Sequence, residues 1–173
     1  MFILEFLAKL VKILRSAASP GQIAGGFILG MIIGLTPLWS LHNLLILLLI
    51  IILNVNISMA ILGFVVFSGI AYLFDPLFHN LGFLLLADTE SLRGLWTAMY
   101  NVPVIALSRF NNTLVLGSLI SAIILLAPIY FLSKKSVLAY RESVDPWFQK
   151  LKIVKALKGT KVYGIYEKYS DWS

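Results

Sequence analysis

The sequence predicts an all-α fold: a polytopic helical membrane protein with two broken or re-entrant helical hairpins and two full spans. Sixty per cent of the 173 residues are hydrophobic and only 13% are charged, whereas about a quarter of the residues in ordinary soluble domains are charged. Residues 16–74 contain no Asp, Glu, Lys or Arg, which is more apolar sequence than one soluble core requires. Polar and proline-containing breaks divide this sequence into segments of unequal length.

We expect three parts: an amphipathic interfacial helix at 1–18, a membrane domain at 19–132 and a basic, aromatic cytoplasmic tail at 133–173. At about 100° per residue the charges of the first part share one helix face and the apolar side chains share the other. These charges interrupt the apolar region and no basic segment precedes it, so we expect the segment to be retained rather than cleaved. The charged residues of that face are Glu5, Lys9, Lys12 and Arg15.

A helix is predicted to start near residue 20, because Ser19, Pro20 and Gln22 provide an N-cap, a first-position proline and a capping-box partner. From Pro20 to Leu35 this helix measures about 24 Å, and the next apolar segment, from Leu41 to Leu53, about 20 Å. Both are shorter than the hydrocarbon core of about 30 Å. We therefore expect a helical hairpin that either re-enters or crosses a locally thinned bilayer. Its apex would contain Pro37, His42 and Asn43.

The turn after this hairpin is expected at Asn54 and Asn56, where polar residues interrupt the apolar sequence. Ile57 to Phe74 is then long enough to cross, and Asp75 with Pro76 is expected to end it.

Leu77 to Ala87 is too short to span, and residues 88–101 have the mixed polarity of an interfacial helix. Thr113 to Leu132, preceded by Asn111 and Asn112, is the clearest spanning helix. Pro128 is expected to kink it near its end.

Both termini are predicted to face the cytoplasm of a bacterial inner membrane. The first 20 residues contain three Lys or Arg, residues 133–173 contain nine, and residues 75–111 contain two. Basic residues concentrate on the cytoplasmic side of membrane proteins. The same rule explains the positive net charge, so nucleic acid is not an expected partner. In the tail, a helix from Asp145 to Gly159 and a run of tyrosines ending at Trp172 are expected at an interface.

Three glycines, Gly26, Gly30 and Gly34, form two overlapping Gly-x-x-x-Gly steps. Small residues at this spacing allow the backbone of another helix to approach closely. We call these three residues the glycine face, and we expect a helix to pack on it, from within the chain or from a partner.

A short motif occurs twice, as "PLWSLHNLLILLL" from Pro37 and as "PLFHNLGFLLL" from Pro76. Two copies suggest two broken-helix hairpins, in which half-helix N-termini face an anionic group, as in some transporters. The alternative is that the His and Asn side chains only cap hairpin turns and pair free backbone groups. The residues concerned are His42, Asn43, His79 and Asn80.

Catalysis and metal binding have little support in the sequence. It contains no cysteine and only two histidines, so thiolate chemistry is excluded and a structural metal site or other cofactor is not expected. The carboxylates nearest the apolar region are expected at segment ends. Asp75 and His79, four residues apart, form the only acid and base pair to consider.

The sequence around these motifs resembles the bacterial membrane family called domain of unknown function 2062, from residue 19 to residue 82. The resemblance rests on a Ser-led helix start, a glycine-rich first helix, a central proline, an Asn before the next helix and a Pro-containing segment ending in Leu-Gly. It implies no activity. Some relatives are joined to glycosyltransferases, and a subgroup of this size resembles companions of large envelope proteins. The corresponding residues here are Ser19, Gly26, Gly30, Gly34, Pro37, Asn54 or Asn56, Pro76, Leu81 and Gly82.

The preferred hypothesis is a non-enzymatic inner-membrane subunit that handles lipid or serves envelope biogenesis. Its glycine face and hairpins would receive the transmembrane helix of a larger, membrane-anchored envelope protein. A first alternative is a small lipid or anion carrier, or flippase, that acts as a homo-oligomer and uses His42 and His79 at half-helix ends. A second is a lipid-modifying enzyme that uses Asp75 and His79. Membrane lipids are expected partners in every case.

Overall fold

The computed structural model describes residue 11 and residues 13–144, and these residues contain helices and turns but no strand. A π-helical turn, Leu84–Asp88, extends α4, and a second one, Tyr140–Val144, extends α7. A 3₁₀ turn, Glu90–Leu92, precedes α5. The all-helical prediction is confirmed for this part of the chain. The helices are α2 (Pro20–Leu35), α3 (Leu41–Ile52), α4 (Ile57–Phe83), α5 (Arg93–Tyr100), α6 (Pro103–Ala106) and α7 (Thr113–Ala139).

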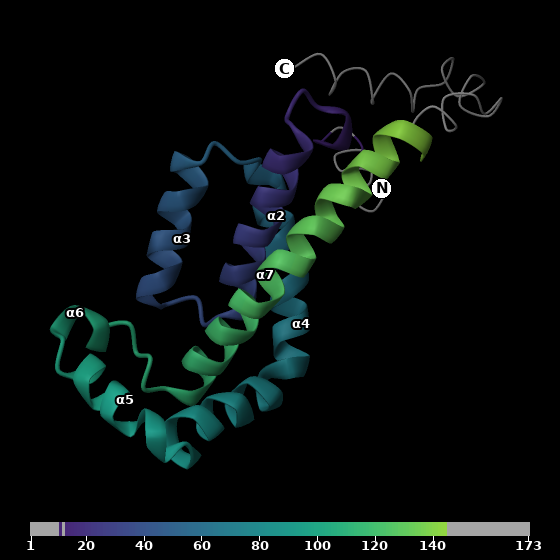
Figure 1. Cartoon of the computed structure of the whole chain (residues 1–173). Helices are drawn as coiled ribbons and strands as arrows, with labels where there is room; N and C mark the ends of the chain where they lie inside the picture. The colour runs from purple at the N-terminus through teal and green to yellow at the C-terminus, as the bar shows by residue number, and fades with distance from the viewer. Residues whose placement is uncertain (1–10, 12, 145–173) are drawn as a thin grey trace, which may run out of the picture.

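The helices α2, α4 and α7 pack against one another, and α3 stands beside α2 as the second arm of a hairpin (Figure 1). The chain direction alternates from α2 to α3 to α4, and α7 returns antiparallel to α4. The start of α2 and the end of α7 therefore lie at one end of the molecule. The short helices α5 and α6 lie at the opposite end.

The predicted helix starts are confirmed, because local side chains cap them. Ser19 Oγ accepts a hydrogen bond from the Gln22 amide at 3.1 Å, and Gln22 Oε1 accepts one from the Ser19 amide at 2.8 Å. Asn56 Oδ1 accepts from the Met59 amide at 3.0 Å. Asn112 Oδ1 accepts from the Leu114 amide at 2.9 Å at the start of α7. Each cap pairs an amide that has no partner inside its helix.

The turn between α3 and α4 is joined to the start of α2. Asn54 adopts the left-handed conformation, with φ of 49°, which asparagine tolerates better than most residues. Its carbonyl oxygen accepts a hydrogen bond from Gln22 Nε2 at 3.2 Å, and the Asn56 amide donates to the Gln22 carbonyl oxygen at 3.1 Å. The predicted turn at Asn54 and Asn56 is confirmed.

The prediction that the helix starting at Ile57 ends at Asp75 and Pro76 is wrong. Pro76 lies inside α4, which continues to Phe83 and then, as a π-helical turn, to Asp88. A proline inside a helix removes one backbone hydrogen bond and crowds the preceding turn, and α4 is visibly curved rather than straight (Figure 1). The second predicted hairpin is therefore absent, and one long helix takes its place.

The last spanning helix is longer than predicted, since it does not end at Leu132. The helix α7 passes Pro128 and Leu132 without a break and ends at Ala139. The residues after Leu132 include no glycine or proline that would end the helix; they are Ser133, Lys134 and Lys135. The expected tail helix from Asp145 to Gly159, the aromatic run to Trp172 and most of the amphipathic segment at 1–18 lie outside the described residues.

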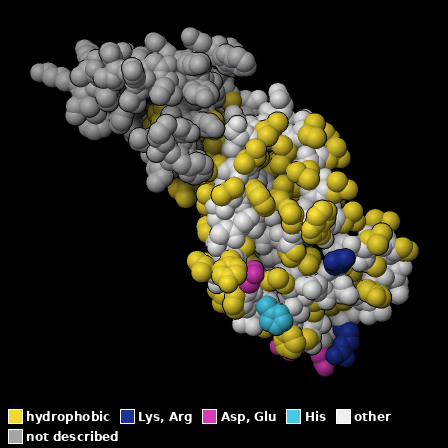
Figure 2. Space-filling view, turned by 180° about the vertical axis from the view of Figure 1, so that it is seen from behind, with side chains coloured by type: hydrophobic (Ala, Val, Ile, Leu, Met, Phe, Trp, Pro, Cys, Tyr) yellow, Lys and Arg dark blue, Asp and Glu magenta, His cyan; other side chains and the backbone are white. Residues whose placement is uncertain are grey.

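Among the described helices, those covering Ile57–Asp88 and Thr113–Ser143 are long and apolar enough to cross a membrane. Only 28% of the most apolar window of each is buried, unlike the core helix of a soluble protein. Figure 2 shows hydrophobic side chains over much of one face of the molecule, with the few charged side chains of that face in its lower part. The short helices α2 and α3 do not reach spanning length.

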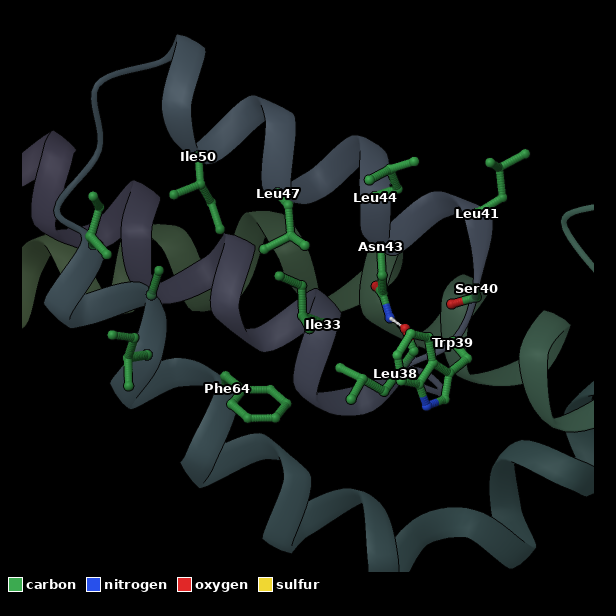
Figure 3. Close-up of a pocket in the computed structure, with 13 residues that line it drawn as sticks. Ile33, Leu38, Trp39, Ser40, Leu41, Asn43, Leu44, Leu47, Ile50 and Phe64 are labelled. Carbon is green, nitrogen blue, oxygen red and sulfur yellow. Dashed lines mark hydrogen bonds between the residues drawn. The ribbon is translucent and has the colours of Figure 1, made fainter.

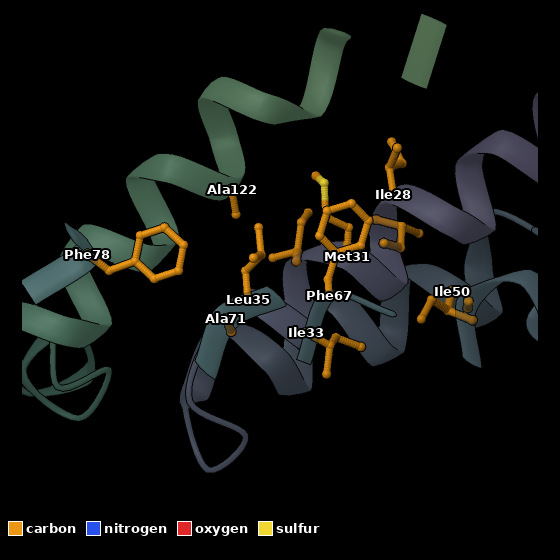
Figure 4. Close-up of a cluster of buried hydrophobic side chains, with 12 residues drawn as sticks. Ile28, Met31, Ile33, Leu35, Ile50, Phe67, Ala71, Phe78 and Ala122 are labelled. Carbon is orange, nitrogen blue, oxygen red and sulfur yellow. The ribbon is translucent and has the colours of Figure 1, made fainter. Parts of the chain in front are cut away.

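The buried core surrounds α2, which contributes most of its length to it. Ile23 and Met31 of α2 are fully enclosed, and the main cluster joins Met31 to Phe67 of α4 and Ala122 of α7 (Figure 4). The rings of Phe27 and Phe67 meet edge to face at 5.7 Å between centroids. The core therefore holds three helices together, whereas α3 buries only Asn43 and Ile50.

Candidate functional site

The glycine face of α2 is covered by α4 of the same chain. A Cβ atom at Gly26, Gly30 or Gly34 would collide with the backbone of α4. Gly63 of α4 is closed in the same way by the backbone of Phe27 in α2. The sequence left two occupants open for this face, and the one present is a helix of the same chain. The expectation that a larger envelope protein places its helix here is therefore wrong, because α4 already fills the face. The facing residues are Asn56, which caps α4, and Ala60 and Phe64 within α4.

The hairpin apex, residues 36–41, is held by Asn43 from the first turn of α3. Asn43 is 3% exposed, and its Nδ2 donates to the carbonyl oxygens of Pro37 at 3.0 Å and Leu38 at 3.3 Å. The Thr36 hydroxyl lies 3.0 Å from Asn43 Oδ1 and 2.8 Å from the Ile32 carbonyl oxygen. Asn43 thus pairs carbonyl groups that the proline-containing turn leaves without helical partners.

His42 is engaged with the same turn. Its Nε2 lies 3.0 Å from Ser40 Oγ, and Ser40 Oγ donates to the Pro37 carbonyl oxygen at 2.6 Å. Ser40 occupies the N-cap position of α3 without capping it through its side chain. The imidazole of His42 therefore contributes to the turn and has a hydroxyl as its partner.

An apolar groove of about 720 Å³ lies between α3 on one side and α2 with α4 on the other (Figure 3). Its polar lining residues are Ser40 and Asn43, both at the apex end, and Leu38 and Trp39 stand at the same end. The rest of the lining is aliphatic or aromatic. The apolar side chains that line it include Ile33, Leu44, Leu47, Ile50, Ile61 and Phe64.

The second copy of the motif folds differently from the first. Asp75, Pro76, His79 and Asn80 all lie within α4, and His79 Nδ1 is 2.7 Å from Thr113 Oγ1 at the start of α7. The carboxylate of Asp75 makes no hydrogen bond or ion pair with any described residue. The hydrogen bond of His79 is therefore made to Thr113 and not to Asp75, and the two histidines belong to different parts of the fold.

The different outcomes of the two copies have a local and a tertiary cause. The first copy contains Ser40 and Leu41 between its aromatic residue and its histidine, which provides an extended N-cap position for a new helix. The second copy lacks these two residues. In addition, Gly82 lies against the backbone of Thr113, and Gly117 lies against the backbone of Phe78. This close crossing of α4 and α7 needs α4 to continue past Pro76.

Neither the α4–α7 crossing nor the groove was predicted from the sequence. Gly117 and Ser121 have the small-residue spacing of a packing face, which was a usable signal. The groove had no such signal, because its walls come from three helices whose relative placement is a tertiary property. Within the described residues no group of three or more His, Asp or Glu side chains is placed to hold a metal ion.

The fold and the site define a small, all-helical protein with two helices of membrane-spanning length and an apolar groove beside a short hairpin. The chain belongs to the family described as "Uncharacterized protein conserved in bacteria (DUF2062)", whose model matches residues 5–144. The resemblance inferred from the sequence is confirmed. The chain is 28% identical over 140 residues to an uncharacterized protein of Treponema pallidum (strain Nichols), and the match covers 81% of this chain and 86% of that protein. No solved structure matches the chain.

Proposed function

We propose that this protein is a non-enzymatic subunit of the bacterial inner membrane. It packs with the transmembrane helix of a larger, membrane-anchored envelope protein and serves lipid transport or envelope biogenesis. In this proposal α4 and α7 cross the bilayer in opposite directions. Each has 27 residues, about 40 Å of helix, which exceeds a hydrocarbon core of about 30 Å.

The distribution of charge supports a cytoplasmic location for the end of the molecule at which α2 begins and α7 ends. Lys134, Lys135 and Arg141 lie in the last part of α7 and the turn after it, and Arg15 precedes α2. Basic residues concentrate on the cytoplasmic side. The short helices α5 and α6 would then lie at the periplasmic interface.

The open space around Gly69 in α4 is the observation that supports a helix partner. A glycine inside a helix costs about 0.5–1 kcal/mol relative to alanine. The other glycines of α2, α4 and α7 each have a neighbouring atom within 4 Å of the Cβ position, whereas Gly69 of α4 has none. Gly69 is exposed between larger apolar side chains, and Tyr72 beside it is 82% exposed.

We call the exposed surface of α4 at Gly69 and Tyr72 the notch at Gly69. It fits an intermolecular helix contact. In a bilayer, apolar burial does not drive helices together, so close backbone approach at small residues contributes much of the attraction. A glycine that no described part of its own chain approaches is therefore best explained by a helix of another chain. The glycine face of α2 cannot serve in this way, because α4 already covers it.

The test is a comparison of complexes purified in mild detergent from cells that express the tagged protein at its native level. We expect the unchanged protein to bring down a large, membrane-anchored envelope protein in stoichiometric amount, and Gly69→Leu to lose it. Gly94→Leu in α5 is the matched control, because Gly94 also has no neighbour within 4 Å but lies off the α4 face. An unchanged complex with Gly69→Leu contradicts the proposal.

The groove favours the carrier as a second candidate function. In that case a second copy of this chain would occupy the notch at Gly69, and the purified protein alone would move lipid between liposome leaflets. His42→Ala would then stop transport. If the protein purifies as a homo-oligomer without another protein, the carrier replaces the subunit as the better explanation.

A further inference from the structure

We infer that the groove between α3 and the α2–α4 pair binds one acyl chain of a membrane phospholipid, with the head group at the hairpin apex beside Trp39. This site is separate from the notch at Gly69, and it does not depend on which partner occupies that notch. The argument rests on the chemistry of the lining, the volume of the groove and the way α3 is attached.

The lining leaves no buried polar atom for a ligand. Both polar groups of Asn43 are already used by the apex, and the Ser40 hydroxyl is paired with Pro37 and His42. A sugar, nucleotide or peptide placed in the groove would have to bury polar groups without partners, at a cost of about 1–3 kcal/mol each in protein contexts. A hydrocarbon chain has no such groups, so the lining selects it.

The volume of the groove is that of a site for a small ligand. Pockets for small ligands measure about 300–1,000 Å³, and the groove, at about 720 Å³, lies within this range. Along α3 the lining runs from Leu41 to Ile50, about 15 Å of helix, and the hydrocarbon depth of one leaflet is also about 15 Å.

The wall formed by α3 is attached at its two ends and open between them. Asn43 fixes the apex end, and Ile50 packs into the core near the other end, where the following turn is bonded to Gln22. Leu44 and Leu47, between these points, face the groove but remain more than half exposed. Exposed apolar side chains are stabilised by an apolar cover, and an acyl chain that lies along the groove would provide one.

The apex suits a head group but offers no charge to select one. Trp39 is 87% exposed at the groove's end, and tryptophan prefers the level of lipid head groups. Residues 16–74 contain no charged side chain. The site should therefore bind phospholipids of different head-group charge equally well. Its selectivity should depend on the acyl chain.

The experiment counts lipids bound to the delipidated, full-length protein by native mass spectrometry after adding phosphatidylcholine or phosphatidylglycerol with chains of the same length. Leu47→Trp fills the groove, and Leu48→Trp is its control, since both leucines are 51% exposed but Leu48 does not line the groove. We expect one retained lipid for the unchanged protein and for Leu48→Trp. Leu47→Trp should lower its retention at least tenfold, and the two lipids should bind alike.

A second variant protects the test against misfolding of the first. Ile61→Trp enters the groove from α4 and should lower lipid retention as Leu47→Trp does, with unchanged helicity by circular dichroism. Equal lipid retention by both groove variants and Leu48→Trp overturns the inference. The inference is also overturned if the unchanged protein retains no lipid and the groove variants dissociate a homo-oligomer, because the groove would then bind a second copy of the chain. Gly69→Leu should leave the bound lipid in place. The proposal of a lipid in the groove and the proposal of a helix partner at Gly69 are therefore tested separately.

Discussion

Gly30 in the middle of α2 lies directly against the backbone carbonyl group of Ala60 in α4. Gly63, one turn further along α4, lies in the same way against the backbone of Phe27 in α2. At their closest approach, each helix therefore places a glycine against the backbone of the other, and a larger side chain would have no room there. This contact sets the distance between α2 and α4, and thereby forms one wall of the groove.

Replacing Gly30 with alanine should destabilise the protein by at least about 1–3 kcal/mol, the cost of overpacking a tight core. The added Cβ would meet backbone atoms of α4, which cannot rotate away as a side chain can. Thermal unfolding in detergent, followed by circular dichroism, measures the effect. The control, Gly69→Ala, has open space around the new methyl group and should gain up to about 1 kcal/mol from helix propensity. Similar melting temperatures for the two variants would show that the helices are not in close contact at Gly30.

Replacing Asn43 with leucine should loosen the hairpin apex. The carbonyl groups of Pro37 and Leu38 and the hydroxyl of Thr36 would lose the buried amide that binds them. Leaving a buried polar group without a partner costs about 1–3 kcal/mol. Limited proteolysis at residues 36–41 should become faster. His42→Ala, which removes only a contact to Ser40, should have the smaller effect, and the reverse order would contradict this account of the apex.

His79 and Thr113 should behave as a coupled pair that joins α4 to α7. Their side chains are 2.7 Å apart, in an exposed position, so each single change, His79→Ala or Thr113→Val, should cost only about 0.5–1.5 kcal/mol. The double variant should lose less stability than the sum of the two, because the shared hydrogen bond can be lost only once. A double-mutant cycle of unfolding free energies measures this coupling. Strict additivity would mean that the two side chains do not interact in solution.

Replacing Arg141 with lysine should release the segment that precedes α2. Arg141 Nε donates to the Leu14 carbonyl oxygen at 2.7 Å, and one terminal nitrogen donates to the carbonyl oxygens of Ser16 and Ala18, both at 2.9 Å. Lysine keeps the charge but has no planar fork to reach three carbonyl groups.

Trypsin cleavage after Arg15 should therefore become several-fold faster in Arg141→Lys. Lys135→Ala, an exposed basic residue near the same end of α7, is the control and should leave the rate unchanged. If both variants are cleaved at the same rate as the unchanged protein, Arg141 does not hold this segment.

Features that depend on neighbouring residues were determined by the sequence alone. The starts of α2, α4 and α7 were predicted within a residue, because Ser19, Asn56 and Asn112 pair amides only two or three positions away. The all-helical class and the turn at Asn54 follow from equally local causes. Such interactions need no other part of the chain to be in place.

Tertiary structure decided the features in which distant segments meet. Pro76 is an expected helix end by local rules, yet α4 continues because Gly82 and Phe78 pack on α7. The glycine spacing of α2 predicted a close helix, but only the fold identified α4 as that helix. The groove depends on how α3 is placed relative to α2 and α4, and no single segment of the sequence determines that placement. The physical reason is that close packing of backbones at glycines acts between two helices, so the sequence of either helix contains only part of the pattern.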